Sequence, residues 1–144
     1  MRIFGIDPGT INVGYGVVDN EDGMHMVGCG VVRLSSRTPI GERLCSLYNE
    51  LTGIIQEYRP DEVAIEEPFV GHNIRSALAI GRAQAIAILV AAKQGLPIYY
   101  YSPAQIKEQV TSYGRSDKQQ VQAMVEIQLG LKQTPRSSDA ADAL

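Results

Sequence analysis

The sequence predicts an α/β domain in which an antiparallel meander is followed by alternating helices and strands. Three strand-like runs near the start, residues 3–6, 13–18 and 24–34, are separated only by turn residues. Helical patterns then alternate with two short strand-like runs at residues 62–66 and 98–101. A strand reached through a helix lies parallel to its neighbour by a right-handed crossover. One mixed sheet covered by helices is therefore expected.

Length and composition predict one globular domain spanning residues 1–144. The chain has 44% hydrophobic and 20% charged residues, and Cys29 and Cys45 lack metal-type spacing, so reduced thiols in the cytoplasm are expected. A strand follows Met1 and Arg2 directly, which predicts no signal peptide, and no apolar run is expected to be long enough for a membrane span. Because the net charge is −3, overall basic charge gives no evidence for nucleic-acid binding. The same charge does not exclude DNA as a ligand.

The first strand ends at Asp7, where Pro8 and Gly9 force a turn. Two interpretations of Asp7 stand equally well on this stretch alone. A carboxylate at the end of a central strand is costly to bury unless it is paired or holds a metal. Alternatively, Asp7 caps the turn through its own backbone. Carboxylates elsewhere in the chain decide between them.

Capping residues predict where three of the helices begin. Thr38 is the expected N-cap of a helix that starts at Pro39 and ends before Pro60, and Ser102 caps a helix that starts at Pro103. Ser116 is the expected cap of a helix that runs through Leu129.

Residues 73–94 predict a long, Ala-rich helix that is apolar nearly all round. Such a helix exceeds what one small sheet covers. A second contact is therefore expected, most simply a homodimer interface around Ala79, Gln84, Ala87, Leu89 and Ala91.

Two further groups of residues end or form strands. Glu66 and Glu67 end the strand at 62–66, and one of them should lie at the same sheet end as Asp7. Tyrosines 99–101 form most of the strand at 98–101. They suit a base-stacking platform, but strand propensity and core packing explain them more simply.

The chain ends with the acidic pair Asp139 and Asp142. A helix capped by Ser137 or Ser138 places them three residues apart on one face, where they repel each other unless a cation lies between them. The competing interpretation is a solvated first helical turn stabilised by the helix dipole. The chain stops at Leu144, barely into this helix, so we expect further residues to follow.

Together the acids predict a site for hard divalent cations. Asp7, Glu66, Asp139 and Asp142 supply oxygen ligands only, which suits Mg²⁺ or Mn²⁺. Two such ions roughly 3.5–4 Å apart clamp a phosphodiester, one activating water and the other stabilising the leaving oxygen. No P-loop is present, and the glycines around Asp7 are wrongly spaced for a dinucleotide fingerprint.

With these residues assembled, the sequence resembles RuvC-type Holliday junction resolvases of the RNase H-like fold. The matching stretches lie in order along the whole chain: GIDPGT at 5–10, GYGVV at 14–18, AIEEPF at 64–69, the Asn-Ser-Ala-Leu-Gly-Ala pattern at 73–83, and DAADAL at 139–144. The resemblance implies a five-stranded mixed sheet in the order 3-2-1-4-5. It also implies a homodimer that nicks two opposing strands of a four-way DNA junction symmetrically, in recombination and repair, with the RuvA and RuvB branch-migration complex as partner.

The resemblance also assigns site residues. The family's four acids fall on Asp7, Glu66, Asp139 and Asp142, which leaves Glu67 as a neighbour. Its two active-site lysines fall on Lys107 and Lys118, and its aromatic residue near the junction falls on Phe69. A lysine near the scissile phosphate stabilises charge that develops in the transition state. Less specific phosphate contacts are expected from Arg75, Arg82 and Arg115.

The sequence departs from the family pattern in three places. Ala85 stands where many members have glycine, the basic tail usual after the last motif is absent, and the end at Leu144 removes helix that should hold the last two acids. The last two departures bear on DNA affinity and on the activity of these 144 residues.

Three other functions compete with a resolvase. An actin-like ATPase fragment shares the Asp-Pro-Gly-Thr turn but needs two domains and leaves Asp139 and Asp142 unexplained. A non-catalytic junction-binding module is a second alternative, although all four acids are present. A third is an RNase H-like nuclease that acts on RNA–DNA hybrid.

Overall fold

The computed structural model describes residues 1–67, 73–131 and 138–144. Five strands form one sheet in the order β3-β2-β1-β4-β5. The elements are β1 (Arg2–Asp7), β2 (Asn12–Asn20), β3 (Met24–Arg33), α1 (Ile40–Tyr58), β4 (Glu62–Glu66), α2 (Ile74–Lys93), β5 (Ile98–Tyr101), α3 (Pro103–Thr111), α4 (Lys118–Gln128) and α5 (Ser138–Asp142).

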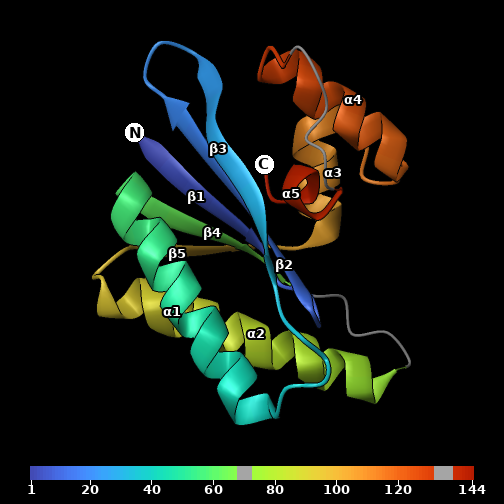
Figure 1. Cartoon of the computed structure of the whole chain (residues 1–144). Helices are drawn as coiled ribbons and strands as arrows, with labels where there is room; N and C mark the ends of the chain where they lie inside the picture. The colour runs from blue at the N-terminus through green and yellow to red at the C-terminus, as the bar shows by residue number, and fades with distance from the viewer. Residues whose placement is uncertain (68–72, 132–137) are drawn as a thin grey trace.

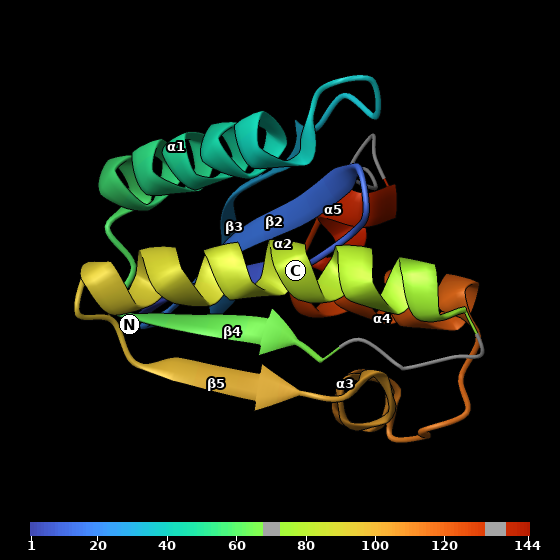
Figure 2. The ribbon, with the colours of Figure 1, turned by 90° about the horizontal axis from the view of Figure 1, so that it is seen from below.

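The sheet is mixed, as the sequence predicts. β1 pairs antiparallel with β2 and parallel with β4, while β3 and β5 form the two edges. Figure 1 shows α1 and α2 on one face of the sheet and α3, α4 and α5 on the other. Figure 2 shows that the turn after β1, the end of β4 and the N-terminus of α2 lie at one end of the sheet.

The main core lies between the sheet and the α1–α2 layer. Alternate residues of β1 and β4 point into it, among them Phe4, Ile6, Val63 and Ile65, each at most 2% exposed. The residues between them, including Gly5, Asp7, Ala64 and Glu66, therefore face the α3–α5 side. A smaller cluster of Val18, Val125 and Leu129 packs on that side. Because side chains alternate along each strand, one face of the sheet packs in the main core and the other face carries Asp7 and Glu66.

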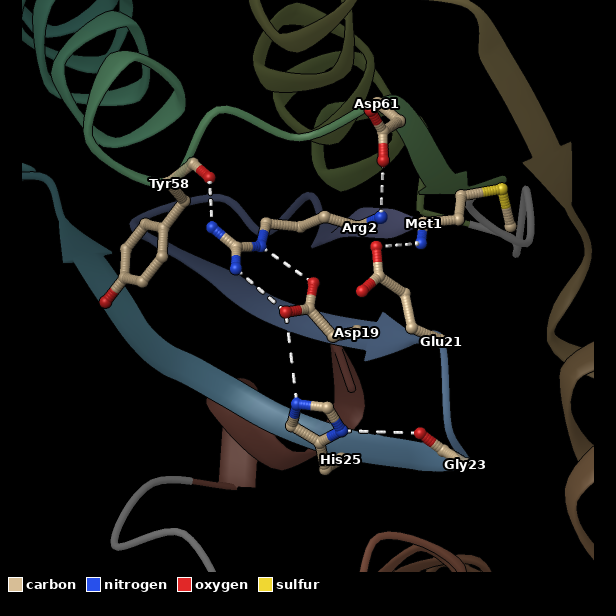
Figure 3. A network of polar contacts seen from close by, with 8 residues as sticks. All are labelled: Met1, Arg2, Asp19, Glu21, Gly23, His25, Tyr58 and Asp61. Atoms are coloured by element: carbon tan, nitrogen blue, oxygen red, sulfur yellow. Dashed lines mark hydrogen bonds and ion pairs between the residues drawn. The ribbon is translucent and has the colours of Figure 1, made fainter.

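Polar contacts fix the end of the sheet that lies away from these acids (Figure 3). The Arg2 guanidinium donates two hydrogen bonds of 2.8 Å to the Asp19 carboxylate and one of 2.7 Å to the Tyr58 carbonyl, and the Arg2 amide donates to Asp61. The N-terminal amine pairs with Glu21 at 3.2 Å. These bonds join β1 to β2 and to the end of α1.

Two predicted caps are wrong by one residue. The N-cap of α1 is Pro39 rather than Thr38, and that of α4 is Asp117 rather than Ser116. Asp117 forms a capping box with Gln120, while the Ser116 hydroxyl is buried and bonded to Thr111 and to the Tyr113 carbonyl. A hydroxyl already held by its own turn cannot serve the helix. The Ser102 cap of α3 is confirmed, with its own capping box to Gln105. The N-cap of α5 lies outside the described residues.

Helix α2 corrects two further expectations. By length and composition alone, this helix of 20 residues is long and apolar enough to cross a membrane. The expectation that no apolar run would be long enough for a membrane span is therefore wrong. Core helices pass the same test, and Ala83, Ala87, Val90 and Ala91 of α2 are buried in the main core. Ala87 and Ala91 therefore cannot line a dimer interface. Leu89, which was also predicted for that interface, is exposed, and it lies on the outward face with Ile74 and Leu78.

The three tyrosines of β5 also differ from the favoured expectation. Tyr99, Tyr100 and Tyr101 are 40–46% exposed rather than packed in the core. β5 is an edge strand, so little of the helix layers covers it. High strand propensity places these residues in the sheet without deciding their burial.

Glycines on β1 and β2 allow the backbone of α5, and of Ala143 directly after it, to contact the sheet. A Cβ atom at Gly5 would collide with the carbonyl oxygen of Ala143, and one at Gly14 would collide with that of Asp139. A Cβ at Gly16 would lie 2.8 Å from the same Ala143 oxygen. Since these neighbours are backbone atoms, α5 can occupy this position only over a strip without side chains.

We expect Gly14→Ala to displace α5 and to lower the unfolding temperature by several degrees, because the clash is with backbone that cannot rotate away. Thermal unfolding measures this. Gly53→Ala, in the middle of α1 with open space around its Cβ, is the matched control and should be neutral or stabilising. An unchanged unfolding temperature for Gly14→Ala would show that α5 is not held by this contact.

Candidate active site

Asp7 and Glu66 end two neighbouring parallel strands. They follow the paired residues Ile6 and Ile65 and point to the same face of the sheet. Their carboxyl groups share a hydrogen bond. Two carboxyl oxygens can bond to each other only through a proton, so this contact favours the protonated form of one of the two acids. The turn-capping interpretation of Asp7 therefore does not account for its side chain.

Electrostatics identify Glu66 as the proton donor in this pair. Burial raises the pKa of Glu66 to about 7, and the negative charges of Asp7 and then Asp142 act in the same direction. Burial, together with Asp142 and Asp139, also raises the pKa of Asp7, while the hydrogen bond from Glu66 opposes that rise. Uncompensated negative charge is thus concentrated at the ends of β1 and β4.

Asp139 and Asp142, the two acids of α5, add their negative charge to that of the strand ends. Asp142 accepts a hydrogen bond and ion pair from the Lys118 ammonium group at the start of α4. This bond to Asp142 raises the pKa of Lys118. Asp139 acts on both Asp7 and Lys118 through its charge. The structure therefore brings all four predicted acids within electrostatic range of one another.

A pocket of about 310 Å³ holds most of these charged groups. It is lined by Asp7, Glu66, Pro103, Ile106, Lys107, Lys118, Val121 and Asp142. Both predicted lysines lie in this one groove, and Lys107 counteracts the rise in the pKa of Glu66. Asp139 does not line it. A second cavity of about 380 Å³, mostly apolar, shares Glu66 and Asp142 as lining residues and lies between the sheet and α3, α4 and α5.

The predicted arginine contacts lie outside the pocket. Arg75 and Arg82 belong to α2, where Arg82 borders an apolar groove with Ile74 and Leu78. Arg115 is exposed in the turn between α3 and α4. Phe69 lies outside the described residues. None of the three arginines lines the described carboxylate pocket.

No complete metal cage is formed by the described part of the chain. Within it, no three His, Cys, Asp or Glu side chains are grouped so that they could hold an ion. The contacts above explain this arrangement. The raised pKa of Glu66 favours its neutral form, and the Lys118 ammonium group is bonded to Asp142.

Gly5, Gly14 and Gly16 are the site residues that sequence reasoning missed. They bear no reactive group, but they set the height of α5 above the sheet and hence the position of Asp139 and Asp142. Their alternation with apolar residues in strands is a readable signal, because glycine at alternate strand positions marks a close backbone approach.

Comparison with known proteins decides the family. The sequence profile described as "Crossover junction endodeoxyribonuclease RuvC" matches residues 3–144. The chain belongs to the RuvC family of crossover junction endodeoxyribonucleases. It is 49% identical over its whole length to the RuvC of Dehalococcoides mccartyi strain BAV1, covering 87% of that protein. It is 46% identical to the RuvC of Roseiflexus sp., covering 86% of it.

Solved RuvC structures have the same fold. A structure of Thermus thermophilus RuvC superposes with a TM-score of 0.91 at 34% identity, covering 99% of this chain and 89% of that one. The same protein in complex with a Holliday junction substrate superposes with a TM-score of 0.94 and 34% identity, over 99% and 88% of the two chains. The yeast mitochondrial resolvase Ydc2, at 15% identity and a TM-score of 0.68, shares the fold.

The raised pKa of Glu66 predicts a pH-dependent stability in metal-free buffer. The folded protein keeps this proton up to about pH 7, whereas an unfolded glutamate loses it near 4.5, so stability from this group falls as the pH rises between those values. Glu66→Gln mimics the protonated form. At pH 8 we expect it to be more stable than the parent chain by about 1–2 kcal/mol, a value reduced for solvent screening.

Denaturant unfolding of the variant at pH 4.5 and pH 8 measures this difference. Glu67→Gln removes the same charge from the adjacent, exposed residue and serves as the matched control, with an expected effect within about 0.5 kcal/mol. Equal stability of the two variants at pH 8 would contradict the assignment of the buried proton to Glu66.

Proposed function

We propose that this chain resolves four-way DNA junctions by metal-dependent hydrolysis of two opposing strands. The observation that carries the proposal is the cluster of four acids and two lysines, drawn from five elements, in a chain of the RuvC family. A relative at 34% identity was solved with a Holliday junction bound. Asp7, Glu66, Asp139 and Asp142 are the proposed catalytic acids, and Lys107 and Lys118 the proposed cations at the scissile phosphate.

The acids fit a pair of Mg²⁺ ions, for which Mn²⁺ would substitute. The donor set consists of carboxylate oxygens, which these cations prefer, and the half-buried carboxyls of Asp7 and Glu66 have raised pKa values because of burial first and of neighbouring negative charge second. When bound, the metal would supply a water activated for attack and charge stabilisation for the leaving oxygen. The four acids named above would hold it, once Lys118 and the shared proton have left them.

The protein's own groups have distinct tasks in this reaction. Lys107 and Lys118 line the same pocket as Asp7 and Glu66, so a phosphate entering it meets two ammonium groups. In this structure the Lys118 ammonium group is bonded to Asp142. It can break this hydrogen bond and donate to a phosphate oxygen instead. Such donors stabilise negative charge as it develops on the phosphate. Neither Ser nor Cys lines the pocket among the described residues, so no covalent nucleophile is required there.

The outward face of α2 suits the proposed homodimer. Ile74, Leu78 and Leu89 are 47–73% exposed, and a groove beside Arg82 and Ala85 continues this apolar surface. Two active sites related by a two-fold axis match the two opposing strands of a junction. Sedimentation at tens of micromolar tests this proposal, and a strict monomer would contradict it. The RuvA and RuvB complex as partner and the cytoplasm as location belong to the same proposal.

Cleavage of a labelled mobile four-way junction in Mg²⁺ tests the function. We expect paired, symmetric nicks that leave 5′-phosphate and 3′-hydroxyl ends, and much weaker cutting of linear duplex or RNA–DNA hybrid. Asp7→Asn should lower cleavage at least ~100-fold and leave junction affinity nearly unchanged, since the carboxylate acts on the reaction rather than on binding. Preferred cutting of the hybrid would favour the RNase H-like alternative, and binding without cutting would favour a non-catalytic module.

Lys118 and the metal should compete for Asp142. We expect Lys118→Gln to bind Mn²⁺ several-fold more tightly than the parent chain in the absence of DNA, because the variant frees that carboxylate. Titration calorimetry or the Mn²⁺ electron paramagnetic resonance signal measures this. Lys107→Gln is the control, since it removes an equal charge from the same pocket without an ion pair to Asp142. If both variants gained the same affinity for Mn²⁺, the gain would come from the loss of positive charge in the pocket and not from the broken ion pair with Asp142.

A further inference from the structure

The connection from β3 to α1 carries basic residues that the proposed site does not use. Between Arg33 and Arg43 the chain has three arginines, Arg33, Arg37 and Arg43, against one acid, Glu42. The complete chain has a net charge of −3, so this segment is a local concentration of positive charge. Arg33 and Arg37 are exposed. We call residues 33–43 the basic connection.

The side chains of these arginines have no ion-pair or hydrogen-bond partner within the described residues. Each lacks an ion pair, and the buried Nε atom of Arg43 has no hydrogen-bond acceptor. Arg2 provides the contrast at the far end of the sheet, where its guanidinium is bonded to Asp19 and to the Tyr58 carbonyl. A buried guanidinium N–H without an acceptor is costly. The exposed guanidinium groups of Arg33 and Arg37 are the donors of the basic connection that an external acceptor can reach.

The sheet register places the basic connection beside the acids. Asp7 pairs with Gly14 and Gly14 with Val31, so Arg33 lies two residues beyond the level of Asp7, where it pairs with Asn12. The Leu34 amide then donates to the Ile11 carbonyl in the loop that follows Asp7. Figure 2 shows the β3–α1 connection and the β1–β2 turn at the same end of the sheet. Two strand spacings separate β3 from β1, about 10 Å.

This position is on the opposite flank of the site from the lysines. Lys107 belongs to α3, which follows the edge strand β5, whereas the basic connection follows β3 at the other edge of the sheet. Cations thus border the acids on two sides. A distance of about 10 Å corresponds to the rise of about three base pairs along the DNA helix axis. A backbone that crosses the acids would reach both groups.

We propose that the basic connection binds the sugar–phosphate backbone of the DNA strand a few nucleotides from the cleaved bond. This inference rests on the proposed function and adds a substrate contact to it. Arg33 and Arg37 would contact phosphates from exposed positions. Arginine suits this task because its planar fork matches phosphate oxygens. The contact positions the strand without reading its sequence.

The test compares Arg33→Gln/Arg37→Gln with the parent chain in binding of a four-way junction across a salt series. Both side chains are exposed, so the variant should fold, which thermal unfolding checks. We expect affinity to fall about 3- to 10-fold near 0.15 M salt and the slope of log K against log salt to become shallower by about 1–2, since each lost phosphate contact contributes about 0.9. Arg59→Asn is the control for the loss of an arginine away from the site: it removes one positive charge at the far end of α1 and should bind as the parent does.

Neutral methylphosphonates at two to four nucleotides from the cleaved bond locate the contact. They should weaken binding of the parent chain and weaken binding of the double variant much less. Unchanged affinity and salt slope, or a loss no larger than that of Arg59→Asn, would overturn the proposal. A parent chain that binds the junction but does not cut it would instead contradict the proposed function, and the binding comparison would still decide the role of the basic connection.

Discussion

The direct contact between α5 and the sheet determines the geometry of the candidate site. Backbone carbonyls of Asp139 and Ala143 lie where side chains would stand if Gly5 and Gly14 were any other residue. This close approach brings two carboxylates from the end of the chain to the two that end β1 and β4. A helix at ordinary packing distance, separated from the strands by side chains, would leave Asp142 too far away to act on Glu66.

Bringing four carboxylates together creates an electrostatic cost that the protein meets with its own positive charge. Glu66 retains a proton, and Lys118 bonds to Asp142. Both compensations are reversible, since a proton exchanges with solvent and a lysine side chain can rotate away. The acids are therefore held in place by strands and a helix, whereas the proton and the Lys118 ammonium group can leave them. This arrangement is expected where divalent ions and a phosphate must enter later.

The sequence predicts the strands and their ends well because their signals are local. Strand alternation, the ends at Asp7 and Glu66, and the strand order implied by family resemblance all agree with the structure. Errors arise where tertiary context decides. Ser116 is diverted into its own turn, and Ala87 and Ala91 belong to the core rather than to an outer face. The glycine strip was missed because its meaning depends on α5, more than 100 residues away in the chain.

The distribution of charge reconciles an acidic chain with a DNA substrate. Acids concentrated at the site cannot themselves attract a phosphate backbone, so affinity must come from cations around them. The structure offers lysines on the α3–α4 flank and unpaired arginines on the β3–α1 flank, while at the opposite end of the sheet Arg2 is bonded to Asp19. The net charge of −3 averages these regions and hides them. The position of each cation and its acidic partner are therefore more informative than the number of cations, because DNA must meet either an unpartnered cation or one, such as Lys118, that can leave its partner.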